Sequence, residues 1–418
     1  MFGPRRQTMQ RGRGIAAVLA AFALILSLTA SLSAGRKKTE KPAPEVKPNI
    51  LDLLDYSKIV WPNPPAITRI KYLNYFSAEK FQLKANQKQK VAWMDRLSGV
   101  VAGDVRTDKP RFQLVTPYGL AVDSKGRLYV ADSKVLAVFI FDTQTKDVEL
   151  IKNGTHARFG WITGLTMDDA DRLFVADSKM RRVVVFDSQH QVEGAINEGM
   201  VDPGGMAIDN ENRFLYVPDA ELDQVLVYDA DPPYKLLRRM GTGGKEHRLT
   251  TPGDFARPTN VAVDQDGNLY VSDTLNDRVE IFDADGNFIR TFGKPGDGPG
   301  YFARPKGIAI DGDGHVWVAD AVQNRVQVFT PEGRLLIWMG EPGNLPGQFN
   351  ALAGLTIDKR NRVFTSEQYP GRVQMFQYID DAQAIAERDR RLAEAQKKKT
   401  GAPAKEAVAD RAQPAAVK

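Results

Sequence analysis

One unit of sequence recurs six times between residues 119 and 367, and this repetition constrains the fold more than any other feature. Each copy has a short apolar run that ends in Asp, then a turn, an alternating segment such as "LYV" and a second acid. The copies span 119–132, 164–177, 205–219, 260–273, 307–320 and 354–367, and their starts lie 45, 41, 55, 47 and 47 residues apart. Copies at such a spacing predict one structural unit repeated along the chain.

The hydrophobic pattern within each copy predicts strands. Apolar and polar residues alternate, and β-branched and aromatic side chains are common. Beyond the second acid a turn leads to "RVEIF" or "RVQVF", and a further turn leads to segments such as "FIRTF" (288–292). Four antiparallel strands repeated roughly every 40 to 50 residues are typical of a propeller, in which each repeat forms one blade. The sequence therefore predicts an all-β, six-bladed β-propeller of four-stranded antiparallel blades.

The ring needs a closing strand, because the sixth copy ends after "RVQMFQYID" (372–380) without a clear fourth strand. Upstream of the first copy, "PAITRIKYLNYF" (65–76) has the pattern of a strand without a partner. We expect it to complete the last blade, since closure removes exposed sheet edges. The propeller is then predicted to span 65–380. A helix inserted near 86–104 is expected over one mouth of the channel, or as a docking or gating element.

These repeats, together with connections such as "GKPGDGPGYFARP" (293–305) and "GEPGNLPGQF" (340–349), resemble the NHL repeat family of six-bladed propellers. The resemblance covers roughly 65–380 and implies the fold. Members of that family include binding scaffolds, RNA binders and a few lyases, so the resemblance implies no single function.

The two ends of the chain differ from the repeats. Residues 1–35 carry four arginines followed by the uncharged run Ile15–Ala34, which as a helix would be about 30 Å long, the thickness of a bilayer core. We interpret this segment as a cleaved signal peptide or as a signal anchor in the inner membrane. Residues 36–64 are expected to form a linker, and 381–418 a helix followed by a disordered tail. The protein is thus predicted to be exported, either at the periplasmic face of the inner membrane or released into the periplasm or the medium.

Charge argues against a nucleic-acid partner. Of the net +5, residues 1–59 contribute +6 and residues 380–418 contribute +2, so the middle of the chain carries 5 − 6 − 2 = −3. Nucleic-acid-binding domains usually present a basic face. There are no cysteines, which excludes disulfides and thiolate metal sites.

The first acid of each copy is predicted to hold a turn. These acids are Asp123, Asp168, Asp209, Asp264, Asp311 and Asp358, in contexts such as "DGDGH" and "DQDGN". Aspartate initiates such turns by accepting backbone N–H groups. The second acid is followed five residues later by arginine in four copies, which predicts an ion pair across one hairpin. The predicted pairs are Asp177–Arg182, Asp273–Arg278, Asp320–Arg325 and Glu367–Arg372.

The copies without that arginine suggest a binding surface. Ala137 and Gln224 replace it in the first and third copies, and the third copy is followed by the longest connection, 241–258. We expect this part of the ring to bind a basic partner or a cation. The candidate residues are Asp132, Asp219, Glu221, Asp223, Gln224, Lys245 and His247.

No catalytic residue or metal ligand is predicted. The four histidines, His156, His190, His247 and His315, fall in different loops and are not expected to converge on one metal. The innermost strands carry no charge, and Asn260 stands where the other copies have Gly. We therefore predict a non-catalytic scaffold that binds a protein or peptide partner in the cell envelope, without a cofactor. The alternative is a metal-dependent lyase or hydrolase with a divalent cation, such as calcium, at the rim or in the channel.

Overall fold

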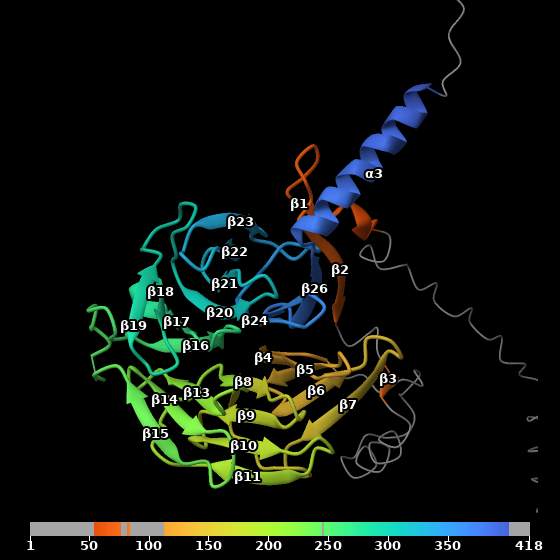
Figure 1. Ribbon diagram of the computed structural model, residues 1–418. Coiled ribbons are helices and arrows are strands. Elements are labelled where there is room, and N and C mark those ends of the chain that lie inside the picture. The colour runs from red at the N-terminus through yellow and green to blue at the C-terminus, as the bar shows by residue number, and fades with distance from the viewer. Residues whose placement is uncertain (1–53, 77–81, 84–112, 245, 401–418) are drawn as a thin grey trace, which may run out of the picture. The chain divides into compact units, whose positions relative to one another are not determined.

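The computed structural model describes residues 54–76, 82–83, 113–244 and 246–400. The predicted signal segment, the helix near 86–104 and the tail beyond residue 400 lie outside these residues. The described part forms six β-sheets arranged as the blades of a ring, which confirms the predicted six-bladed propeller (Figure 1). No helix in this part of the chain is long and apolar enough to cross a membrane.

Each blade is an antiparallel sheet whose innermost strand contacts the innermost strands of its neighbours. From inside to outside, the strands of blade 1 are β4 (Pro117–Val122), β5 (Leu128–Asp132), β6 (Ala137–Phe141) and β7 (Asp147–Lys152). Those of blade 2 are β8 (Ile162–Met167), β9 (Leu173–Asp177), β10 (Arg182–Phe186) and β11 (Val192–Ile196). Those of blade 3 are β12 (Ala207–Asp209), β13 (Phe214–Asp219), β14 (Gln224–Asp229) and β15 (Leu236–Met240).

The second half of the ring repeats this order. Blade 4 contains β16 (Pro258–Val263), β17 (Leu269–Asp273), β18 (Arg278–Phe282) and β19 (Phe288–Phe292). Blade 5 contains β20 (Pro305–Ile310), β21 (Val316–Asp320), β22 (Arg325–Phe329) and β23 (Leu335–Met339). Blade 6 contains β24 (Leu352–Ile357), β25 (Arg362–Glu367), β26 (Arg372–Tyr378) and, from the N-terminal side, β2 (Ile70–Phe76).

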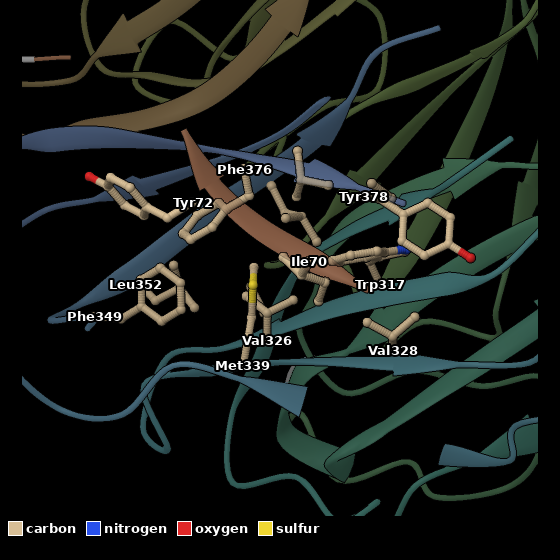
Figure 2. Packing of buried hydrophobic residues seen from close by; sticks show 14 residues of the cluster. Ile70, Tyr72, Trp317, Val326, Val328, Met339, Phe349, Leu352, Phe376 and Tyr378 are labelled. Carbon is tan, nitrogen blue, oxygen red and sulfur yellow. The ribbon is translucent and has the colours of Figure 1, made fainter. Parts of the chain in front are cut away.

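Strand β2 closes the ring as predicted. It pairs antiparallel with β26, so that Ile70 lies opposite Tyr378 and Phe76 lies opposite Val373. Figure 2 shows Ile70 and Tyr72 of β2 among buried side chains of blades 5 and 6, including Trp317 and Phe376. Tyr72 meets Phe376 edge to face, with ring centroids 5.3 Å apart. The N-terminal strand is therefore part of the core, and not only a cover for the sheet edge.

Two blades carry a fifth strand on their outer edge. Strand β1 (Val60–Trp61) pairs with β2, and β3 (Gln82–Leu83) pairs with β7. The sequence assigned 36–64 to a linker, but a short 3-10 helix (Tyr56–Lys58) and β1 extend the propeller on its N-terminal side. Several prolines lie near these short elements, and they interrupt the alternation of apolar and polar residues by which a longer strand would be recognised.

The hydrophobic core lies between neighbouring blades. One cluster, for example, combines Tyr270 and Ile281 of blade 4 with Val316 and Phe329 of blade 5. Strands in the middle of a blade are covered on both faces, so β5, β9, β17 and β21 are buried along their whole length. A single blade could not bury both of its faces, and the closed ring does.

Glycine in the innermost strands lets the blades approach closely. A Cβ on Gly354 of β24 would lie 2.1 Å from the carbonyl oxygen of Tyr118 in β4. Nearby, the hydroxyl of Ser366 donates to that same oxygen at 2.7 Å, which joins blade 6 to blade 1. The recurring glycine at this position is therefore required by the packing of adjacent blades.

After the last blade the chain forms α3 (Asp381–Thr400), over the residues for which the sequence favours a helix. Two ion pairs connect its first turns to β2 and the residue before it. Lys71 Nζ lies 3.2 Å from Glu387, and Arg69 pairs with Asp381.

Candidate functional site

The first acids of the six copies hold the turns between the innermost and second strands, as predicted. Asp311, for example, accepts the amide N–H groups of Asp313 (3.0 Å) and His315 (2.9 Å). Its second oxygen accepts the indole N–H of Trp317 at 2.8 Å. Asp123, Asp168 and Asp358 use that oxygen for an arginine four residues later. These acids are thus engaged by their own turns, and Asp168 also pairs with Arg213 of blade 3.

The second acids form a ring on the opposite face, where the blades are connected. Asp320 accepts four amide N–H groups, from Ala303 (2.7 Å), Arg304 (3.2 Å), Val322 (3.0 Å) and Gln323 (2.9 Å). The first two donors precede the acid by 17 and 16 residues, in the connection from the previous blade. Asp132, Asp177, Asp219, Asp273 and Glu367 also accept an amide from the preceding connection. All six are fully buried, and each one ties its hairpin to that connection.

Only two of the four predicted acid–arginine pairs form. Arg278 Nε donates to Asp273 at 2.8 Å, and Arg372 Nε donates to Glu367 at 2.8 Å. Burial raises the pKa of Asp273 and of Glu367 even though these arginines lower it. In the other two hairpins the arginine turns to a backbone carbonyl, and no ion pair joins the two side chains among the described residues. Arg182 donates to the oxygen of Arg158 and Arg325 to that of Asp297.

These two exceptions have a common cause. In Asp177 and Asp320 both carboxylate oxygens are occupied by amides of the connection and of the hairpin turn. In Asp273 the turn contributes the side chain of Asn276 instead, and Arg278 shares the same oxygen. The repeated acid thus serves mainly to accept backbone N–H groups, and arginine pairs with it only where a carboxylate oxygen is accessible.

The binding residues predicted in blades 1 and 3 are mostly structural. Asp132 and Asp219, which lack the arginine, are buried and accept amides like the other second acids. Asp223 is also buried; it accepts the amide of Arg257 at 2.8 Å and meets His247 Nδ1 at 2.7 Å. This contact fastens the long connection 241–258 over blade 3.

The remaining candidates are partly exposed or not described. Gln224 is half-buried and bonds Gly241 and Arg239. Glu221 is exposed, and Lys245 lies outside the described residues. The predicted acidic surface therefore does not form as a cluster, because burial withdraws Asp132, Asp219 and Asp223 from any partner.

The histidines are distributed as expected, each with its own contact. His156 Nδ1 accepts the amide of Lys152, His190 contacts Tyr129, His247 contacts Asp223 and His315 contacts Asp311. One group of possible metal ligands is found in the described residues: Asp311, Asp313 and His315, whose ligand atoms lie within 4.8 Å of one another. The hydrogen bond to Asp311 raises the pKa of His315. Calcium usually takes six to eight oxygen ligands, so this group offers an incomplete shell.

The central channel has an uncharged wall. Its cavity of about 250 Å³ is lined by the innermost strands, whose polar side chains there are Thr166, Asn260 and Thr356. No Asp, Glu, His, Lys or Arg is among the described residues that line it. This wall offers neither an acid–base pair nor a charged ligand for a cation.

The mouth of the channel on the connection face is different. A cavity of about 450 Å³ lies there, and three cationic residues line it together with one acid. The cations are Arg257, Arg304 and Lys306, and the acid is Asp202. Arg257 lies 3.6 Å from Asp202, whereas Arg304 and Lys306 have no ion pair among the described residues. The Lys306 ammonium lies 5.6 Å from the centre of the Tyr118 ring. We refer to this group of residues as the cationic mouth.

The repeats contain a signal for this site that the sequence reasoning missed. Lys306 stands directly before the innermost glycine of its copy, where other copies have Tyr118, Thr163, Gly204, Thr259 and Ala353. Arg304 is two residues earlier, where other copies have Thr116, Trp161, Asp202, Arg257 and Ala351. These two positions vary more than the intervening position, which is Pro in four copies, and the following one, which is Gly in five, so the blade itself does not require a particular residue at them.

Comparison with known proteins agrees with this architecture. The ring of four-stranded blades around a narrow channel defines a six-bladed β-propeller, and a family profile described as 6-bladed beta-propeller matches residues 250–315. The profile of the NHL repeat matches residues 302–329. The family resemblance stated from the sequence is thus confirmed over residues 250–329, where the chain matches these two profiles.

Individual relatives are more distant. A stretch of 48 residues is 50% identical to Protein lin-41 of Caenorhabditis elegans, and it covers 12% of this chain and 4% of that protein. Virginiamycin B lyase from Staphylococcus aureus has a TM-score of 0.48 at 12% identity, covering 63% of this chain and 96% of that one. A protein of unknown function from Bacteroides thetaiotaomicron has a TM-score of 0.50 at 16% identity, covering 65% and 71%. At 16% identity, the second of these structures shares the fold alone with this chain.

Proposed function

We propose that this chain is an exported NHL-repeat propeller that acts as a non-catalytic, protein-binding scaffold in the cell envelope. Export is inferred from the arginine-rich start and the uncharged run Ile15–Ala34, with the propeller tethered to the inner membrane or released by cleavage. The proposal is supported by a single surface feature, an apolar groove at the outer edge of blade 5.

The groove is a cavity of about 590 Å³ between β23 and the N-terminal segment before β2. Leu336 and Trp338 line it from β23, opposite Pro62 and Ile67. The side chains of Leu336 and Trp338 are 44% and 46% exposed, which are high values for large apolar side chains. Because they are alternate residues of one strand, both project to the same side. Exposed tryptophan beside a cavity is typical of a contact that dominates the affinity of a protein interface.

We infer that the occupant is an extended segment of a partner protein that pairs with β23. Strand β23 is the outer edge of its sheet in the described part of the chain, so its outward backbone groups have no strand to pair with. Blades 1 and 6 already hold a fifth strand at the corresponding edge, through β3 and β1. Addition of a strand to an exposed edge provides backbone hydrogen bonds, and apolar side chains of the segment would fill the groove.

The test is site-specific crosslinking in intact cells, with the full-length chain carrying a photoreactive phenylalanine at position 338 or, as a matched control, at position 237. Leu237 is similarly exposed (43%) on the outer strand of blade 3 and does not line this groove. We expect one partner to be captured from position 338 and not from 237. Capture should be lost when Leu336→Asp is added, because a charge would be placed in the apolar contact.

Equal capture from both positions, or capture that survives Leu336→Asp, would contradict the proposed interface. No reproducible crosslink from position 338 would contradict the scaffold role as stated. Thermal unfolding of the Leu336→Asp variant is the control for folding, and we expect little change because the residue lies at the surface.

The alternative function, a metal-dependent lyase or hydrolase, is favoured by one observation, the group Asp311, Asp313 and His315. Its test is metal analysis of the purified protein beside the Asp313→Asn variant. A stoichiometric divalent cation that is lost in this variant would favour the alternative over the scaffold. If the purified protein neither retains nor binds a divalent cation, the metal-dependent alternative loses its support.

A further inference from the structure

We propose that the cationic mouth binds a small organic anion carrying two negative charges, such as a dicarboxylate or a phosphate monoester. This site is separate from the groove of blade 5, and it does not depend on the scaffold function proposed above. The inference rests on the charge balance of the cavity, on two cations that form no ion pair with a carboxylate of the described residues and on the size of the cavity.

The charge balance comes from the residues that line the cavity. Arg257, Arg304 and Lys306 contribute three positive charges and Asp202 contributes one negative charge, so the balance is 3 − 1 = +2. Asp202 lies beside Arg257 and far enough from the other two cations to form no ion pair with them. Within the cavity the uncompensated charge is therefore located on Lys306 and on Arg304, whose charge also lowers the pKa of Asp277 outside the cavity lining. A dianion would neutralise both.

Lys306 is the more informative of the two cations. It is half-buried, and burial together with the neighbouring charge of Arg304 lowers its pKa. A half-buried ammonium without a carboxylate partner is costly to maintain. Its nearest aromatic neighbour, Tyr118, lies beside the ammonium and completes one wall of the cavity. A bound anion would supply the counter-charge that the described residues do not.

Size and chemistry point to the same class of ligand. A cavity of about 450 Å³ lies within the range of sites for small molecules, roughly 300–1,000 Å³. An arginine guanidinium matches the geometry of a carboxylate or phosphate, and a lysine binds either as a point charge. The hydroxyls of Thr163, Thr259 and Thr274 already bond neighbouring residues. Recognition is therefore expected to depend on charge.

The experiment is calorimetric titration of the full chain with succinate, glycerol phosphate and a short peptide ending in two glutamates. Comparison of the three probes identifies whether the anionic group belongs to a free dicarboxylate, a phosphate ester or a protein. The variants are Lys306→Met, which keeps the apolar stem, and Arg304→Ala. The matched control is Arg360→Ala, an exposed arginine at the other mouth of the channel.

We expect at least one probe to bind with one-to-one stoichiometry, and its affinity to fall about tenfold or more in Lys306→Met and in Arg304→Ala. Arg360→Ala should bind as the unchanged protein does. The proposal is overturned if no probe shows saturable binding at millimolar concentration. It is equally overturned if all three variants lose the same affinity, because binding would then reflect net charge only. Thermal unfolding of each variant, measured in parallel, separates a lost site from a lost fold.

Discussion

The two mouths of the channel use charge in opposite ways. At the turn face, Asp123, Asp168 and Asp358 line a cavity of about 210 Å³. Each of them accepts the amides of its own turn and the arginine four residues later. At the connection face, Arg304 and Lys306 line the cavity with no carboxylate partner among the described residues.

The difference follows from repetition. The carboxylates of the turn face recur in all six copies, because every blade needs the same turn. The cations of the connection face occur in only some copies, at positions that otherwise hold Thr, Tyr, Trp, Gly, Ala or Asp. Charges that repeat with the blades therefore stabilise the architecture, and charges that do not repeat are available for a ligand.

Asp320→Ala should cause the largest loss of stability. The substitution leaves four amide donors without their buried acceptor. We expect the free energy of unfolding to fall by about 3–5 kcal/mol, because unsatisfied buried donors bear the cost of desolvation. Denaturant unfolding measures it, with the exposed Asp313→Ala as the control. A loss below about 1 kcal/mol would show that the repeated acids are not the main connection between blades.

Gly354→Ala tests the seam between blades 6 and 1 without changing any charge. The added Cβ would lie 2.1 Å from the carbonyl oxygen of Tyr118, which belongs to the backbone and cannot easily move. We expect a loss of about 3 kcal/mol in denaturant unfolding. Gly298→Ala is the matched control, since its Cβ would meet nothing closer than 3.5 Å. Equal behaviour of the two variants would contradict the close packing of the blades.

Glu280→Gln tests a charge that replaces a repeated neutral residue. Glu280 accepts the amide of Gly253, as Gln327 and Gln374 accept those of Gly300 and Gly347 in the next two blades. Burial raises the pKa of Glu280 to about 7 from 4.5, although Arg278 lies 3.0 Å away. The amide should therefore fit the site of blade 4 as it fits those of blades 5 and 6.

The pH dependence has a definite sign. Between about pH 4.5 and 7 the folded state holds the Glu280 proton more tightly than the unfolded state, so the contribution to stability falls as pH rises and is constant above pH 7. Glutamine does not titrate. The stability of Glu280→Gln relative to the unchanged protein should thus grow from pH 4.5 to 7, by about 3 kcal/mol. Denaturant unfolding at several pH values measures it, and a difference independent of pH would contradict the raised pKa.

The sequence was sufficient for the fold because the evidence for it is repeated. Alternation, turn residues and spacing recur six times, and the missing fourth strand of the last copy identified β2 as the closing strand. Hydrogen-bond partners were harder to predict. The arginine five residues after the second acid was visible in four copies. The amides 16 and 17 residues before that acid were not, since they approach only when the connection folds back.

The cationic mouth was missed for the opposite reason. Repeats direct attention to what is common to the copies, whereas Arg304 and Lys306 occur where the copies differ. The predicted acidic surface of blade 3 failed because the loss of a hairpin arginine does not leave an acid unpartnered: Asp219 accepts backbone amides instead. Comparing the copies position by position at the connection face would have found the cations.

Removing the cations should have the smallest effect on stability. Arg304 is exposed, and Lys306 bears a half-buried charge without a counter-ion. We therefore expect Arg304→Ala to change the free energy of unfolding by less than about 0.5 kcal/mol, and Lys306→Met to be neutral or slightly stabilising, because it removes a charge that burial disfavours. Arg278→Ala, which breaks the pair with buried Asp273, is the contrasting variant and should be clearly destabilised. If Lys306→Met lowers the free energy of unfolding by more than about 1 kcal/mol, this cation stabilises the blade. The division between repeated and unrepeated charges would then fail at the position where it matters most for binding.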